Sequence, residues 1–183
     1  MKFYNTLKVL PLITLFFVSC SDDNDIPDPV NEEELITTMT VTLTPLGGGD
    51  IILESQDLDG DGPNAPVITV SGPLSANSTY SGTVELLNET ENPAEDITEE
   101  VGEEADEHQF FYVVSGAVSG VTYTDQDGNG NPVGITFELT TSDAGAATLN
   151  VTLRHEPKKP NDGTLADAGG ETDITQTFTL TVQ

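Results

Sequence analysis

Apolar residues alternate with threonine and other polar residues in four stretches of this chain, at 38–45, 133–141, 147–155 and 174–183. Successive side chains of a β-strand point to opposite faces of the sheet, so this period of two predicts strands with one buried and one solvated face. Strands of this kind belong to antiparallel sheets that pack against each other. The alternation therefore favours an all-β fold over every other class.

Three denser apolar runs, at 51–55, 83–87 and 109–114, predict central strands. Turn sequences rich in glycine, aspartate and asparagine separate the runs, and "SDAG" at 142–145 predicts a β-hairpin between the two stretches that flank it. Strands at this spacing, with little helix, predict an antiparallel β-sandwich of about 7–9 strands over residues 37–183.

One short acidic helix or ordered loop is expected to interrupt the strands after residue 91. Asn92 is suited to cap a helix, Pro93 to occupy its first position and Glu95 to complete the start. Ile97 and Val101 are four residues apart, so a helix would place them on one buried side.

The segment "PLSANSTY" places Leu74 six residues before Tyr80 and leads into the strand expected at 83–87. It resembles the tyrosine corner of immunoglobulin-like and fibronectin-III sandwiches, in which the tyrosine hydroxyl bonds to the upstream backbone. The resemblance implies an Ig/fibronectin-III-like sandwich; an ordinary core tyrosine is the alternative.

The N-terminus has the pattern of a bacterial export signal. Lys2 and Lys8 precede an apolar run at 9–18, which is shorter than the ~20 residues that span a bilayer and fits a signal peptide. The letters "FVSC" that end at Cys20 resemble the lipobox of bacterial lipoproteins. This resemblance implies removal of residues 1–19 and acylation of Cys20; the alternative is an ordinary signal peptide with a fortuitous cysteine near the cut.

Residues 20–36 carry several acids, two prolines and little apolar content, which predicts a disordered tether. The stretch "SDDND" after Cys20 resembles the signal that sends lipoproteins of Bacteroidota to the outer face of the outer membrane. It implies an outer-membrane lipoprotein exposed at the cell surface, with the lipid anchor as its contact with the membrane. A merely acidic spacer is the alternative.

The charge of the chain excludes one class of partner. The formal net charge of −27 becomes −29 once Lys2 and Lys8 are removed with the signal. Nucleic acid is therefore excluded as a partner, because its phosphates would be repelled. The remaining bases, Arg154, Lys158 and Lys159, fall within six residues, and we expect them to contact acidic segments of the same protein.

Two aspartate-rich turns resemble the first half of a calcium-binding loop, in which alternating carboxylates precede a glycine. Neither has the glutamate at position twelve, where Ile68 and Thr136 stand. Plain tight turns are the alternative. The predicted calcium ligands are Asp57, Asp59, Asp61, Asp125, Asp127 and Asn129.

The two histidines, His108 and His155, stand where predicted strands meet loops, beside Glu107 and Glu156 respectively. His108 would open its strand and His155 would close its own, so an antiparallel arrangement would place both at one end of the sandwich. Two imidazoles and a carboxylate are suitable ligands for zinc or another transition ion. A pair of hydrogen-bonded boundary histidines is the alternative.

No sequence feature indicates catalysis: the chain has neither a Gly-x-Ser-x-Gly elbow nor a Walker loop, and it has no tryptophan. Over its whole length it resembles short acidic lipoproteins of Bacteroidota, in pieces such as "NEEELITT", "DLDGDGPNAP", "DEHQFF", "TLRHEP" and "AGGETDI". That group is sometimes labelled a type 1 periplasmic binding fold, but such proteins alternate strands with helices and this chain does not.

We therefore expect a non-catalytic surface lipoprotein that binds a ligand or cation, beside a TonB-dependent transporter. The alternative is a structural or adhesive surface module with no small ligand.

Overall fold

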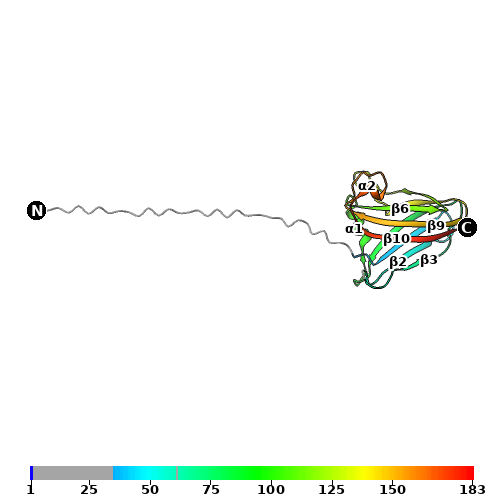
Figure 1. Ribbon diagram of the computed structural model, residues 1–183, viewed down its shortest axis with the longest axis horizontal. Helices are drawn as coiled ribbons and strands as arrows, with labels where there is room; N and C mark the ends of the chain where they lie inside the picture. Colours follow the sequence, from blue (N-terminus) through cyan, green and yellow to red (C-terminus); the bar gives the residue numbers. More distant parts are fainter. Residues whose placement is uncertain (2–34, 61) are drawn as a thin grey trace. The chain divides into compact units, whose positions relative to one another are not determined.

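The computed structural model describes residues 1, 35–60 and 62–183, and within them residues 35–183 contain all the regular structure (Figure 1). The elements run in the order β1 (Thr38–Pro45), β2 (Ile51–Gln56), β3 (Val67–Val70), β4 (Thr79–Asn88), β5 (Glu95–Asp96), α1 (Ile97–Glu103), β6 (His108–Gly116), β7 (Val118–Tyr123), β8 (Thr136–Thr141), β9 (Gly145–His155), α2 (Leu165–Ala168) and β10 (Glu171–Val182). Residues 2–34 and Asp61 lie outside the described residues, and with them nearly all of the predicted signal, Cys20 and most of the predicted tether. None of the described helices is both long and apolar enough to cross a membrane.

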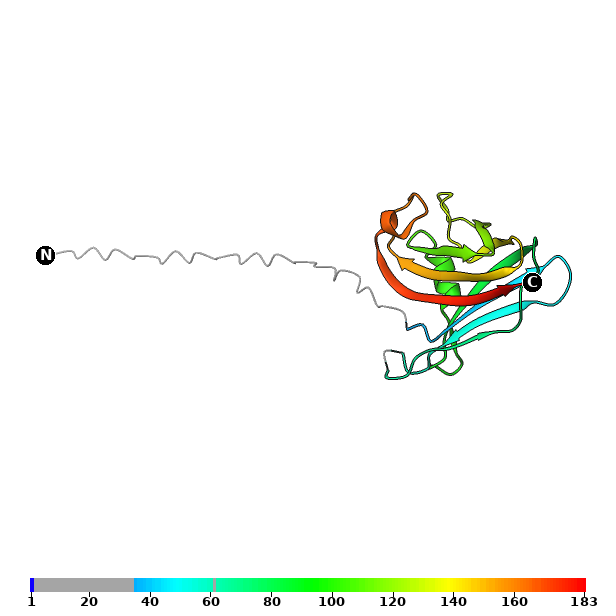
Figure 2. The same cartoon turned by 45° about the vertical axis from the view of Figure 1, so that its right-hand side comes forward.

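The strands form two antiparallel sheets, which confirms the predicted all-β sandwich. One sheet has seven strands in the order β3-β2-β1-β4-β8-β7, with β5 paired to β4, and the other has the order β10-β9-β6. Figure 2 shows β9 and β10, in orange and red, lying across the blue and cyan strands of the larger sheet. The described residues thus contain ten strands, slightly more than expected, because the two-residue β5 is among them.

The strand order differs from that of immunoglobulin domains, in which strands A, B, E and D form one sheet and the chain crosses to the other after strand B. Here β1, β2, β3 and β4 all belong to one sheet. The local tyrosine contact is present, since the Ser75 backbone N–H donates to the Tyr80 hydroxyl at 2.7 Å. The resemblance therefore covers the two-sheet architecture and this contact, and it does not extend to strand order.

The predicted hairpin at 142–145 is wrong. β8 and β9 lie in different sheets, so the short turn between them carries the chain from one layer to the other. Alternation reveals which face of a strand is buried, but it does not reveal which strand is the neighbour. β9 instead lies between β6 and β10, where it pairs along almost its whole length on both sides.

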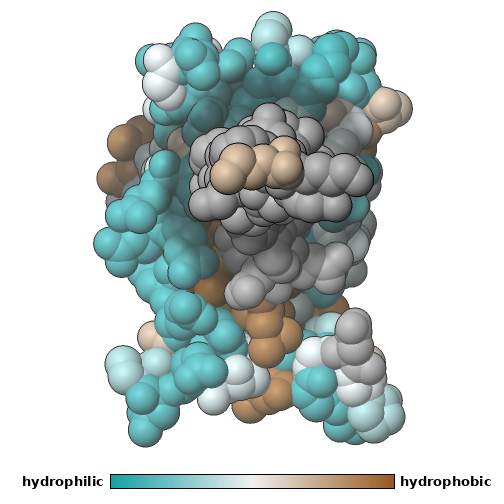
Figure 3. Space-filling view, turned by 90° about the vertical axis from the view of Figure 1, so that its left-hand side faces the viewer, coloured by the Kyte–Doolittle hydropathy of each residue, from teal (hydrophilic) through white to brown (hydrophobic). Residues whose placement is uncertain are grey.

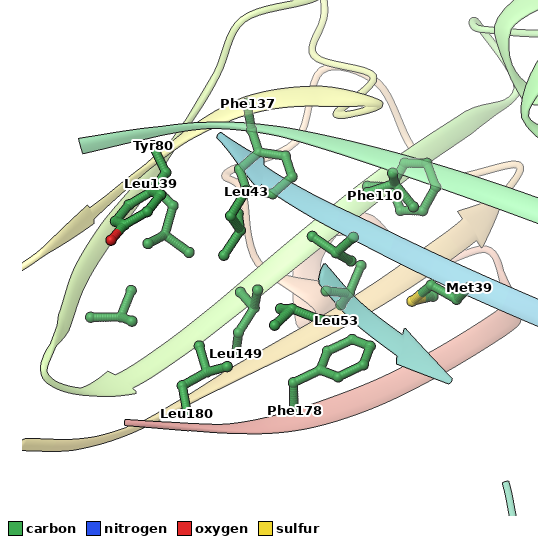
Figure 4. Packing of buried hydrophobic residues seen from close by; sticks show 14 of the residues in the cluster. Met39, Leu43, Leu53, Tyr80, Phe110, Phe137, Leu139, Leu149, Phe178 and Leu180 are labelled. Carbon is green, nitrogen blue, oxygen red and sulfur yellow. The ribbon is translucent and has the colours of Figure 1, made fainter. Parts of the chain in front are cut away.

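The core lies between the two sheets and contains the apolar residues of the alternating stretches (Figure 4). Met39, Leu43, Leu139 and Leu149 are fully buried, and Phe178 lies among them. Ile36, which was assigned to the tether, also packs against this core. The folded domain therefore begins slightly before residue 37.

Helix α1 begins further along the sequence than predicted. Asp96, and not Asn92, is its N-cap, and the Asp96 carboxylate accepts hydrogen bonds from the backbone of Thr98 and Glu99. Glu95 and Asp96 pair with β4, so the backbone is extended up to the cap. Ile97 and Val101 are both buried, as their spacing predicted.

Gly82 provides a test of the packing between β4 and β8. A Cβ atom built on Gly82 would lie 2.3 Å from the Phe137 ring, which is buried in the core. We expect Gly82→Ala to lower the free energy of unfolding by about 1–3 kcal/mol, because the buried ring would have to shift to admit the methyl group. Urea denaturation followed by circular dichroism measures the change.

Gly120→Ala is the matched control, since its Cβ would meet nothing closer than the Thr140 hydroxyl at 3.8 Å. This change should stay within about 0.5 kcal/mol of the parent. Equal losses for the two variants would contradict the packing argument.

Candidate metal site at the end of β6 and β9

The two histidines lie side by side at one end of the three-stranded sheet. His108 is the first residue of β6, His155 is the last of β9, and the two are direct partners in the antiparallel ladder. Their rings stack with centroids 4.6 Å apart and planes inclined by 14°. The expectation that both imidazoles occupy the same end of the sandwich is confirmed.

Two glutamates join His155 at this end. The Glu156 backbone N–H donates to the Glu107 carbonyl at 2.7 Å, which holds the two residues next to each other. One ligand atom each from Glu107, His155 and Glu156 lie within 4.8 Å of one another, and His155 Nε2 is 4.0 Å from Glu107 Oε2. A tetrahedral zinc site needs ligand atoms about 3.4 Å apart. Because Glu107 and Glu156 are exposed, modest side-chain rotation can close the difference.

The backbone at Glu156 has an uncommon conformation. Its φ of 48° lies in the left-handed region, which residues other than glycine seldom adopt and which costs about 1–3 kcal/mol. Gly170 packs directly against this turn, and a Cβ there would lie 2.3 Å from the His155 carbonyl oxygen. The close approach of Gly170 therefore helps to fix the positions of His155 and Glu156.

His108 stacks on His155 but does not belong to the metal cluster, which consists of Glu107, His155 and Glu156. Its side chain is buried, and its Nδ1 lies 3.3 Å from the Glu104 carbonyl. Burial, and then the nearby His155, lower the pKa of His108, so the ring is uncharged at neutral pH. His108 is not among the side chains whose ligand atoms lie within 4.8 Å of one another. The structure thus gathers three of the four predicted ligands and stacks the fourth against one of them.

Two of the three basic residues contact the protein's own acids, as expected, whereas Arg154 donates to the Gly170 carbonyl at 3.3 Å. Lys158 Nζ lies 2.8 Å from Asp167 Oδ1 at the surface. Lys159 is buried, with Nζ 3.4 Å from Asp127 Oδ2, and it donates to the carbonyls of Ala105 and His108 at 2.6 Å each. Burial lowers the pKa of Lys159, while the Asp127 carboxylate opposes that shift. Lys159 therefore holds the start of β6 against the loop that contains Asp127.

The first predicted calcium loop brings two of its aspartates together. A hydrogen bond between the Asp57 and Asp59 carboxyl groups raises the pKa of Asp57 and lowers that of Asp59. The Asn64 side-chain amide also donates to Asp59 at 2.6 Å. Calcium binding at this loop stays a prediction.

The second predicted calcium loop is held by its own hydrogen bonds. Asp125 accepts from the backbone N–H groups of Gly134 and Thr136 at 2.6 and 2.8 Å. Asp127 accepts from those of Asn129 and Asn131 at 2.9 Å each. Burial alone would raise the pKa of Asp127, but the bonds from Asn131 and Asn129 and the Lys159 charge outweigh it and lower the pKa. A calcium ion here would have to displace these partners, and its binding also stays a prediction.

Figure 3 shows a mostly hydrophilic surface over the upper part of this side of the domain, where grey atoms do not cover it. No protein-family model matches the chain, and no curated protein or solved structure matches it either. Its function is therefore inferred from the site itself.

Proposed function

We propose that this chain is a non-catalytic lipoprotein of the outer membrane, exposed at the cell surface, whose β-sandwich binds a divalent transition-metal ion of the zinc class. Its ligands would be Glu107, His155 and Glu156. The lipid anchor follows from the lipobox resemblance at Cys20, and the metal site follows from the side chains at the end of β6 and β9.

The observation that carries the metal proposal is the convergence of three ligand atoms within 4.8 Å. One imidazole nitrogen and two carboxylates form a mixed ligand set that suits zinc. Three protein ligands leave a fourth position open, which suits reversible capture and transfer better than permanent structural binding. The strongly negative charge of the chain would raise the local concentration of cations around the site.

Capture of an ion at the cell surface is useful beside a system that imports it. An accessory role next to a TonB-dependent transporter is therefore part of the proposal. It is supported by the resemblance to lipoproteins of Bacteroidota and by the expected anchor.

Zinc titrated into the metal-free full chain should produce one binding event tighter than the diffuse background of carboxylates, as measured by calorimetry. His155→Ala should remove that event, because it deletes the single nitrogen ligand. Binding should also weaken as the solution is taken from about pH 7.5 to about pH 5.5, since protons compete with the metal for its ligands.

Two control variants separate the cluster from its surroundings. Glu104→Gln removes an exposed acid that lies near Glu107 in the sequence but is not a member of the cluster. This variant should bind zinc as the parent does. His108→Leu keeps the space behind His155 filled, so it should weaken zinc binding by no more than about tenfold. Parent-like zinc binding by His155→Ala would refute the site.

A further inference from the structure

The outer edge of β10 already accepts a short segment of the chain itself. β10 is an edge strand that pairs with β9 on one side only. On its other side, near its C-terminal end, the Leu74 N–H donates to the Thr181 carbonyl at 2.9 Å and the Gln183 N–H donates to the Leu74 carbonyl at 2.8 Å. These bonds form a parallel bridge between Leu74 and Val182. The backbone groups on this side of β10 are therefore suited to strand pairing.

The same edge continues toward the start of the strand. Backbone groups of a strand face the same side every second residue, so Thr175, Thr177 and Thr179 present the same edge as Thr181. Among residues 35–60 and 62–183, no second strand pairs with this part of β10. The described contact to its backbone on this side is the Gln176 side-chain amide, which donates to the Thr177 carbonyl at 2.9 Å.

A groove lies beside this open edge, where the two sheets approach each other. Its volume is about 420 Å³, and its walls come from the first half of β10, from β2 and from the segments that lead into β1 and β3. Ser55 donates to the Gln176 side chain across the groove at 3.0 Å. Alternate side chains of an added strand would point into this groove while its backbone paired with β10.

The charge of the groove indicates what it would accept. Asp57, Glu171 and Asp173 line it, and no basic residue is among its described lining. The chain's own acidic segment at 20–34 carries like charge and is a poor occupant. A second copy would bring the same carboxylates to the edge, which like-charge repulsion disfavours. Lysine and arginine side chains, in contrast, would be attracted.

We propose that the outer edge of β10, from Glu171 to Thr179, is a strand-addition site for an extended, basic segment of a partner protein. The main-chain hydrogen bonds would supply affinity, and the acidic groove would select the alternate side chains. The first residue of this edge, Glu171, is the ladder partner of His155, so the site begins beside the metal cluster, but the backbone groups of Thr175, Thr177 and Thr179 that would pair with the partner lie further along β10.

The test uses a fluorescent ten-residue peptide of alternating lysine and valine, titrated into the full chain and followed by anisotropy. Two matched peptides carry N-methyl groups on every valine or on every lysine, which removes the N–H donors of one edge and leaves the charge unchanged. At least one methylated peptide should bind about tenfold more weakly. The protein is unaltered in this comparison, so folding defects cannot produce the difference.

Variants of the protein give the second arm. Thr177→Pro removes an N–H that faces away from β9, a position where an edge strand tolerates proline, and it should weaken binding about tenfold. The double variant Asp57→Asn with Glu171→Gln should weaken binding more than Glu99→Gln with Glu103→Gln, which changes the charge equally on α1. Thr177→Pro and the double variant on α1 should bind zinc as the parent does, so a failure of this proposal can be told apart from a failure of the metal site.

The proposal is overturned if both methylated peptides bind like the parent peptide, or if the two charge variants weaken binding equally. It is also overturned if the chain dimerises through this edge, so that the peptide fails to bind and Thr177→Pro yields a monomer in sedimentation.

Discussion

Replacing Lys159 with methionine is expected to lower the free energy of unfolding by about 3–5 kcal/mol, because it leaves a buried carboxylate without its cation. The side chains of Lys159 and Asp127 are 6% and 0% exposed. Lys159 also donates to the Ala105 and His108 carbonyls, so three acceptors lose a donor together. For a domain of this size the melting temperature should fall by roughly 10 °C, as measured by calorimetry.

The neighbouring Lys158 is the matched control. Its ion pair with Asp167 has a similar chemistry, but Lys158 is 61% exposed, so Lys158→Met should cost no more than about 1 kcal/mol. Asp127→Asn keeps an oxygen that can accept the Asn129 and Asn131 N–H groups and removes the orphaned charge. Lys159→Met combined with Asp127→Asn should therefore lose less stability than the two single changes added together. If Lys159→Met and Lys158→Met lose similar free energies of unfolding, burial of the Lys159–Asp127 ion pair does not increase the cost of breaking it.

The sequence predicts which faces of the strands are buried, but not how the strands are ordered. Phe137 and Leu139, like Leu149 and Val151, are buried as their alternation requires. The same alternation suits either a hairpin or a crossing between sheets, because both keep those residues in the core. Only the long-range pairing of β9 with β6 and β10 decides between them, and no local signal contains that pairing.

The candidate site was predictable in part for a similar reason. The ends of β6 and β9 could be recognised from the position of His108 and His155, and their antiparallel register placed the two rings together. The stacking that keeps His108 out of the cluster depends on side-chain orientation, which spacing does not specify. The left-handed turn at Glu156 and the close approach of Gly170 also had no signature in the sequence.

Lys159 and the β10 edge show what the sequence leaves out. The basic patch indicated that Lys158 and Lys159 would meet acids, yet nothing in it distinguished the buried lysine from the exposed one. The threonine-rich alternation at 174–183 indicated a half-buried strand, but edge position is a property of the whole sheet. Both features follow from tertiary packing and become visible only once the layers are assembled.

The lipid anchor leads to an all-or-none prediction. Cys20 lies outside the described residues, and its assignment rests on the lipobox resemblance in "FVSC". Burial of acyl chains contributes ~0.8 kcal/mol per methylene, and two chains suffice for stable anchoring. We expect the chain, expressed in a bacterium of the Bacteroidota, to partition almost wholly into the detergent phase on phase separation. Cys20→Ala should abolish this partition, and mass spectrometry should find no acylation of the variant.

Ser21→Ala is the control for this change, because it alters the adjacent residue and leaves the thiol in place. It should be acylated and should partition like the parent. Protease added to intact cells then reports orientation separately: a surface-exposed domain is digested, whereas a domain on the periplasmic side is protected. A parent protein that is cleaved but remains water-soluble with Cys20 unmodified would show an ordinary export signal, and the metal site would then have to act on a released protein.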